Sequence, residues 1–249
     1  MIGRLVVLAV ACLLLGAQGA WAEDVPQQLC PGSAASMAGE TLLQNALKAA
    51  YPNLPERRDD PDESDPEACV YPYQANTFGN TVVLFTLSQK PGEDCHGCGA
   101  KISADFLRRD KDRLVPIARH REFGESGSWG DLTAITPVRA GSDDGIGVEG
   151  GGTFQGETYS SLQIFIFRDG QARAISPENG IILSQSDCDA VPHGKPCTDI
   201  SGTWKMEPAG RVTVSYRGRR NGRTLPPFKV VYDRRGDALE VTSGTPLSF

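Results

Sequence analysis

Apolar and polar residues alternate along much of the chain after position 80, and this two-residue period constrains the fold more than any other feature. In the segment 211–217 the apolar residues fall on one face, as in a strand with one solvated face. Segments 82–85 and 162–167 place bulky side chains on both faces, which predicts central strands covered on both sides. Strands are predicted over residues 81–88, 101–108, 114–119, 132–138, 162–167, 211–216, 229–232 and 238–241.

Short polar turns separate predicted strands at three places, residues 109–112, 168–171 and 234–237. Each predicts a β-hairpin. Their unequal separations give no fixed repeat period, which leaves a propeller as the weaker alternative. The predicted class is mainly β: an antiparallel sandwich or open barrel-like meander, disulfide-stabilised, with a short N-terminal helix.

The N-terminal part of the chain differs in pattern from the rest. Apolar residues between Leu42 and Ala50 recur at helical spacing, Pro52 ends the predicted helix, and Ser36 is a candidate N-cap. Seven acidic residues and two prolines in 56–67 predict a solvated loop. The expected organisation is a signal peptide over 1–22, the helix with its acidic loop over 23–68, and an antiparallel β domain over 69–249.

Export is predicted from the first 22 residues. Arg4 precedes an apolar run over 5–15 that is too short to span a bilayer, and the sequence Ala20-Trp21-Ala22 fits a small-x-small cleavage site. The protein is therefore expected to be periplasmic or secreted, with no transmembrane anchor after signal cleavage.

Six cysteines remain after the predicted leader, and an oxidising compartment favours a disulfide framework among them. Proximity in sequence suggests three pairs, although sequence alone does not select a connectivity: Cys30 with Cys69, Cys95 with Cys98, and Cys188 with Cys197.

The motif Cys95-His96-Gly97-Cys98 has two other interpretations. His96 beside Cys95 would favour a thiolate and so a redox-active pair. Alternatively Cys95, His96, Cys98 and His193 could hold a soft metal ion. The structural interpretation is preferred because exported thiols oxidise and because the neighbouring acids Glu93 and Asp94 oppose thiolate formation. No cofactor and no metal are predicted.

The charge of the chain points away from nucleic acid. The formal net charge is −6, whereas a nucleic-acid binder is usually basic. Basic residues nevertheless gather around Asn221-Gly222, where Arg219 and Arg220 mark a predicted hairpin tip. This tip is either a docking site for an anionic partner or a solvated turn that protects a strand edge.

Two glycine-rich segments suggest binding loops. Residues 145–150 match G-x-G-x-x-G, but the glycines that follow cannot start the helix that the motif needs. A crossing between strands that could line a cleft is predicted there instead. Trp129, flanked by glycine and serine, is either an exposed loop residue or a residue folded onto the core. The candidate binding residues are Trp129, Gly150, Gly151, Gly152, Arg219 and Arg220.

No catalytic residue is predicted. Residues 124–128 fail the G-x-S-x-G pattern, and His120 is expected at a solvated strand end. The sequence therefore predicts an exported non-enzymatic binding module with a protein or cell-envelope partner, in its sharper form an inhibitor- or immunity-type protein acting on an envelope enzyme. A thiol-redox or metal-handling protein using the C-H-G-C motif is the alternative.

Overall fold

The computed structural model describes residues 28–57 and 68–248, and it confirms a mainly β, antiparallel fold with short helices near its N-terminus. The predicted signal peptide and most of the acidic loop lie outside the described residues. The elements are α1 (Ser33–Ser36), α2 (Thr41–Ala50), β1 (Tyr71–Phe78), β2 (Thr81–Leu87), β3 (Ala100–Asp110), β4 (Arg113–Ser126), β5 (Ala134–Ala140), β6 (Asp143–Phe154), β7 (Glu157–Arg168), β8 (Gln171–Ala174), β9 (Ile181–Ser186), β10 (Asp199–Met206), β11 (Val212–Arg220), β12 (Arg223–Arg235) and β13 (Ala238–Ser243).

The strands form three successive antiparallel meanders: β1–β4, β5–β8 and β10–β13. The first meander is a four-stranded sheet, and the other two share a nine-stranded sheet through β9. The last two strands of each meander are joined by one of the three predicted hairpin turns, so those hairpins are confirmed. β8 and β9 both pair with the same edge of β7. β8 pairs with residues 165–168 and β9 with residues 158–162.

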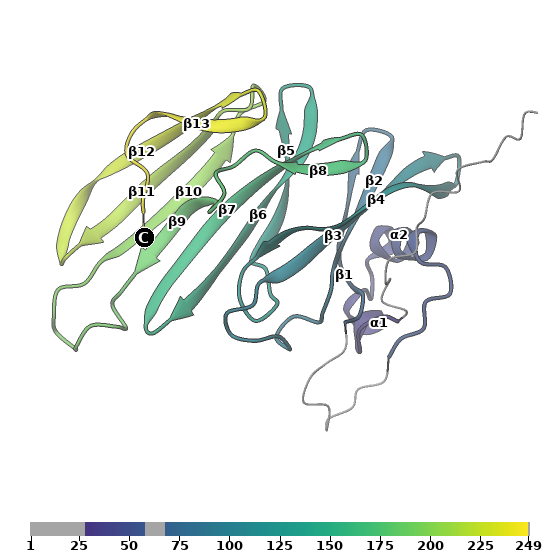
Figure 1. The fold of residues 1–249 in the computed structure, drawn as a ribbon, viewed down its shortest axis with the longest axis horizontal. Coiled ribbons are helices and arrows are strands. Elements are labelled where there is room, and N and C mark those ends of the chain that lie inside the picture. The colour runs from purple at the N-terminus through teal and green to yellow at the C-terminus, as the bar shows by residue number, and fades with distance from the viewer. Residues whose placement is uncertain (1–27, 58–67, 249) are drawn as a thin grey trace, which may run out of the picture.

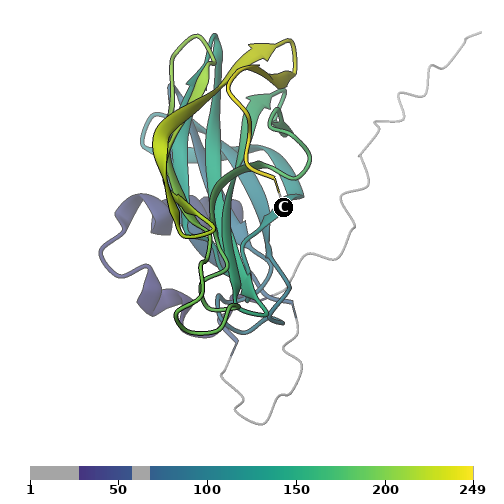
Figure 2. The same cartoon turned by 90° about the vertical axis from the view of Figure 1, so that its left-hand side faces the viewer.

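These units follow one another along the long axis of the molecule (Figure 1). The helices lie at one end, followed by the first meander, then β5–β7, with β11–β13 at the other end. Figure 2, seen from the end that carries β12 and β13, shows how narrow the stack is across this axis.

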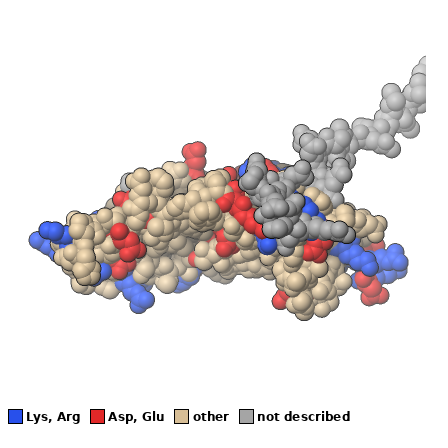
Figure 3. Space-filling view, turned by 90° about the horizontal axis from the view of Figure 1, so that it is seen from below, with Lys and Arg blue, Asp and Glu red and all other residues tan. Residues whose placement is uncertain are grey.

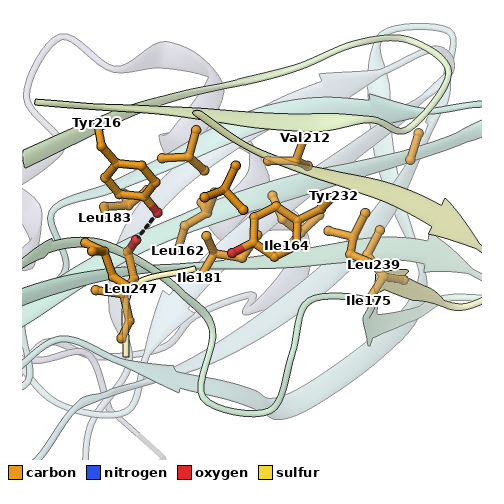
Figure 4. Close-up of a cluster of buried hydrophobic side chains, with 14 of the residues drawn as sticks. Leu162, Ile164, Ile175, Ile181, Leu183, Val212, Tyr216, Tyr232, Leu239 and Leu247 are labelled. Carbon is orange, nitrogen blue, oxygen red and sulfur yellow. Dashed lines mark hydrogen bonds between the residues drawn. The ribbon is translucent and has the colours of Figure 1, made fainter. Parts of the chain in front are cut away.

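The nine-stranded sheet curls so that its two halves face each other. The ring of Trp204 on β10 lies against Gly147 on β6, where an added Cβ would come within 2.7 Å of it. Trp204 also donates a hydrogen bond from Nε1 to Glu149, at 2.8 Å. Figure 4 shows the buried side chains between the halves, among them Leu162 and Tyr216. The Tyr216 hydroxyl donates to the carbonyl of Ile182 at 2.6 Å, so this tyrosine is buried without losing its hydrogen bond.

A second core joins the first meander to β5–β8. Phe85 and Phe106 contact Phe167 through their rings, and Phe123 meets Phe165 edge-on at 5.0 Å. β2 and β7 therefore have apolar contacts on both faces, as predicted from residues 82–85 and 162–167.

The third core lies between α2 and the outer face of the first meander. Beneath the helix Asp105, only 2% exposed, accepts a hydrogen bond from Arg119, whose Nη2 also donates to the carbonyl of Ala50 at 3.2 Å. The guanidinium of Arg119 stacks over the ring of Tyr51 at 4.3 Å. Burial raises the pKa of Asp105 against the opposing effect of Arg119, and burial with the Asp105 charge raises the pKa of Tyr51 to about 12.

The predicted N-cap is wrong. Ser36 is the last residue of α1, and its hydroxyl donates to the carbonyl of Ser33. The longer helix begins at Thr41, because Gly39 with φ +86° separates the two helices.

The glycine-rich segment is also corrected, because it is not a crossing between strands. Residues 143–154 form the regular strand β6, which pairs with β7 over its whole glycine-rich part. No helix among the described residues is long and apolar enough to cross a membrane.

Candidate binding site at the loop end

Five connections gather at one end of the strands and form a surface that we call the loop end. They are residues 88–99, 127–133, 155–156, 187–198 and 221–222. They follow one another across the lower side of the molecule in Figure 1. Two of the three disulfides, Cys95–Cys98 and Cys188–Cys197, are located there. Connections from all three meanders therefore form one surface.

Trp129 lies on this surface and is 48% exposed, so its side chain is not folded into the core. Its backbone has φ +56°, and its ring stacks on His96 with 5.1 Å between ring centroids. Backbone hydrogen bonds link the two loops: Gly92 N donates to the Trp129 carbonyl at 2.8 Å, and Gly130 N donates to the Cys98 carbonyl at 3.0 Å. The Cys95–Cys98 loop thus holds the Trp129 loop in place.

The glycines of β6 allow the Trp129 loop to approach closely. A Cβ at Gly150 would lie 2.4 Å from both Gly127 N and Ser126 Oγ. A Cβ at Gly152 would lie 3.2 Å from Ser128 Cβ. Gly151 does not approach this loop. A Cβ at Gly151 would instead lie 2.2 Å from the carbonyl oxygen of Tyr159 on the neighbouring strand β7. The structure therefore brings Gly150 and Gly152 next to the Trp129 loop.

A cleft of about 620 Å³ opens at the loop end between the first meander and the β7–β9 part of the second sheet. It begins beyond the Phe123–Phe165 contact, where Gln163 Nε2 donates across the gap to the carbonyl of Glu125 at 3.1 Å. Phe154 lines the cleft and is 65% exposed. A volume of this size falls in the range of roughly 300–1,000 Å³ that ligand sites occupy.

Four carboxylates and no lysine or arginine line the cleft: Glu125, Glu157, Glu178 and Asp187. Glu125 Oε1 accepts a hydrogen bond from Gly99 N at 3.1 Å, and Asp187 Oδ1 accepts one from Thr198 N at 2.6 Å. Within residues 28–57 and 68–248, none of the four carboxylates forms an ion pair. The cleft is thus a polar, negatively charged recess with an aromatic side chain in its wall.

Ser126 contributes a buried hydroxyl behind the wall of the cleft. This residue lines the cleft and is 7% exposed, and its Oγ has no hydrogen-bond partner among the described residues. The Oγ faces Gly150 of β6, where an added Cβ would lie 2.4 Å from it, so the hydroxyl is not turned toward the cleft.

The predicted basic tip also lies at the loop end but does not line the cleft. Arg219 and Arg220 end β11, and Asn221 and Gly222 form the turn with φ +50° and +72°. Gly222 N donates to the Cys197 carbonyl at 2.8 Å, so the tip rests on the 187–198 connection. Figure 3, seen from below, shows Lys and Arg side chains at both extremities of the molecule and acidic side chains between them.

The six cysteines pair as proximity suggested: Cys30–Cys69, Cys95–Cys98 and Cys188–Cys197. In the described chain, two groups place potential ligand atoms within 4.8 Å of one another: Asp94 with Cys95 and Cys98, and Asp187 with Cys188 and Cys197. His96 and His193 belong to neither group, so the four-residue metal set is not brought together. The sulfurs in both groups are disulfide-bonded and are not thiolate ligands.

His120 is not at a solvated strand end. It lies inside β4, and its Nδ1 accepts a hydrogen bond from Ala172 N at 3.0 Å, which connects the first two meanders. Burial lowers the pKa of His120, which favours the neutral ring that this contact requires.

The sequence did not identify the acids of the cleft. Glu157 begins β7 and Glu178 stands in the turn before β9, with no motif around either residue. Only the packing of β4 against β7 brings them near Glu125. Comparisons of this chain with protein-family models, with curated proteins and with solved structures find no match.

Proposed function

We propose that this protein is an exported, non-enzymatic binding module that holds a protein or cell-envelope partner against its loop end. In its sharper form it is an inhibitor- or immunity-type protein that blocks an envelope enzyme. The observation that carries the proposal is the loop end itself, where a cleft opens between connections of the first two meanders and the start of the β9–β10 connection. Rigid sheets that present loops are a common platform for recognition.

The exposed aromatic residues support this role. Trp129 and Phe154 are two of the four large hydrophobic side chains that stand exposed in the described chain. Trp129 belongs to the loop end, and Phe154 ends strand β6 directly beside it. Aromatic side chains are enriched among the residues that dominate binding energy at protein interfaces. The disulfides agree with a periplasmic or secreted location, where such bonds persist.

The test is capture of partners by immobilised protein from an envelope extract of the producing cells, followed by titration of the purified partner. Trp129→Ala with Phe154→Ala is expected to weaken the measured affinity roughly tenfold or more. Ile117→Ala with Val241→Ala is the matched control, since these side chains are 50% and 44% exposed and lie outside the loop end. Equal loss in both variants, or capture of no partner, would refute the proposal.

A further inference from the structure

The cleft at the loop end suggests the chemistry of what it binds. We infer that it receives an arginine- or lysine-bearing segment of a partner protein, with the cationic side chain placed among the four carboxylates. This inference rests on the proposed function and specifies which kind of partner surface the loop end recognises.

Charge is the first argument. Glu125, Glu157, Glu178 and Asp187 line one recess without a cation of their own. A guanidinium can donate to carboxylates in several directions at once, and its hydrogen bonds to a carboxylate are stronger than neutral ones. Anionic ligands are disfavoured because no lysine or arginine lines the recess.

The aromatic residues indicate that the occupant is a segment of a larger molecule. Phe154 lines the cleft, and Trp129 lies beside it through its stacking on His96, the neighbour of the lining residue Gly97. A free amine in the cleft would leave Trp129 uncovered, whereas a polypeptide segment reaches both aromatic side chains. Arginine also stacks on aromatic faces, which adds to its fit here.

The direct experiment titrates a fluorescent tetra-arginine peptide with blocked ends into the purified, oxidised protein. Its neutral counterpart, tetra-citrulline, has nearly the same shape. The expected result is that tetra-arginine binds, that tetra-citrulline does not, and that the affinity falls as salt is raised.

Two variants with equal charge changes distinguish the cleft from the general acidity of the chain. Glu157→Gln with Glu178→Gln is expected to weaken tetra-arginine binding roughly tenfold or more. Glu207→Gln with Glu240→Gln changes the net charge equally, outside the cleft, and should leave binding unchanged.

Equal weakening in the two glutamine pairs would overturn the inference, as would binding of tetra-citrulline. Displacement of the peptide by neutral tetra-N-acetylchitotetraose would assign the cleft to a glycan and overturn it too. If tetra-arginine does not bind while partner capture still depends on Trp129 and Phe154, this inference fails and the proposed function stands.

Discussion

At the residue scale the most consequential group is the buried carboxylate of Asp105. It lies under α2 with Arg119 as its charged partner, and Arg119 in turn holds the end of the helix through Ala50. One side chain therefore neutralises a buried charge and also fastens the helix to the sheet.

We expect Arg119→Met to lower the free energy of unfolding by about 3–5 kcal/mol at pH 7, because it leaves a buried charge unpaired. Burial already raises the pKa of Asp105 above 3.8, and loss of Arg119 raises this pKa further. The folded state then binds a proton more tightly than the unfolded state does, so the penalty should shrink as the pH falls through that pKa. Urea unfolding at pH 7 and pH 4 measures this change. Asp105→Asn combined with Arg119→Met should lose the pH dependence, whereas an equal penalty at both pH values for the single variant would contradict the account.

A second residue-scale prediction concerns Gly150. A methyl group there would lie 2.4 Å from Gly127 N and Ser126 Oγ, so strand β6 and the Trp129 loop would have to separate. We expect Gly150→Ala to lower stability by about 1–3 kcal/mol. Gly152→Ala is the matched control, because its nearest contact is 3.2 Å, and it should cost clearly less. Thermal unfolding of both variants gives the comparison, and equal midpoints would argue against this packing.

At the scale of elements, the disulfides differ in how far solvent can reach them. Cys30 and Cys69 are 0% and 1% exposed, whereas Cys95 is exposed to solvent. We expect stepwise reduction to open Cys95–Cys98 first and Cys30–Cys69 last, because a reductant must reach a sulfur to attack it. Alkylation of released thiols and peptide mass mapping at increasing reductant concentration would follow the order. Early reduction of Cys30–Cys69 would contradict it.

The elements that were predicted correctly from the sequence are those whose own residues carry a strand or turn pattern. The alternation in residues 211–216 and the polar turn at 168–171 gave strand β11 and the β7–β8 hairpin correctly. Strand β10 was missed because Gly202 stands at an inward position, where an added Cβ would crowd Tyr216 at 2.8 Å. Strand β6 was missed for the same kind of reason, because Gly147 has no side chain where the ring of Trp204 packs against the strand. In the sequence such a glycine resembles a break in the strand, because the aromatic residue that packs against it is remote along the chain.

The candidate site was predictable in part. Trp129 and the glycines of β6 were recognised from local composition, and the structure places Gly150 and Gly152 beside the Trp129 loop. The cleft acids were not recognised, because a single carboxylate in a strand or turn has no sequence signature until the sheets pack. The site thus depends on long-range contacts that no local pattern encodes.

At the scale of the whole molecule, one ionic network ties the second meander to the third. Asp143 at the start of β6 accepts hydrogen bonds from Arg168 at 2.8 Å and from Arg234 at 2.6 Å. Arg234 also donates to the carbonyl of Ala140 at 2.6 Å. The two arginines come from β7 and β12, so the network closes the curled sheet at the end opposite the cleft.

We expect Asp143→Asn to lower the free energy of unfolding by about 1–3 kcal/mol at neutral pH. The two arginines hold the pKa of Asp143 below 3.8, so its contribution is present above that pH and is lost as the pH falls through the lowered pKa. The difference between wild type and variant should therefore vanish in acid. Asp144→Asn serves as the control, since Asp144 faces a largely exposed Arg139 at 3.6 Å and should cost little. A constant difference across the acid range would refute the role of Asp143.

The two ends of the stack of meanders differ in what covers their outer faces. The helix α2 covers the outer face of the first meander, while the outward side chains Ser201, Thr203 and Lys205 of β10 are polar and exposed. Neither of these end surfaces offers a broad apolar sheet face to another molecule. In the described chain, Trp129 and Phe154 stand exposed on the side that carries the loops, so a partner that approaches from that side can cover two aromatic rings at once.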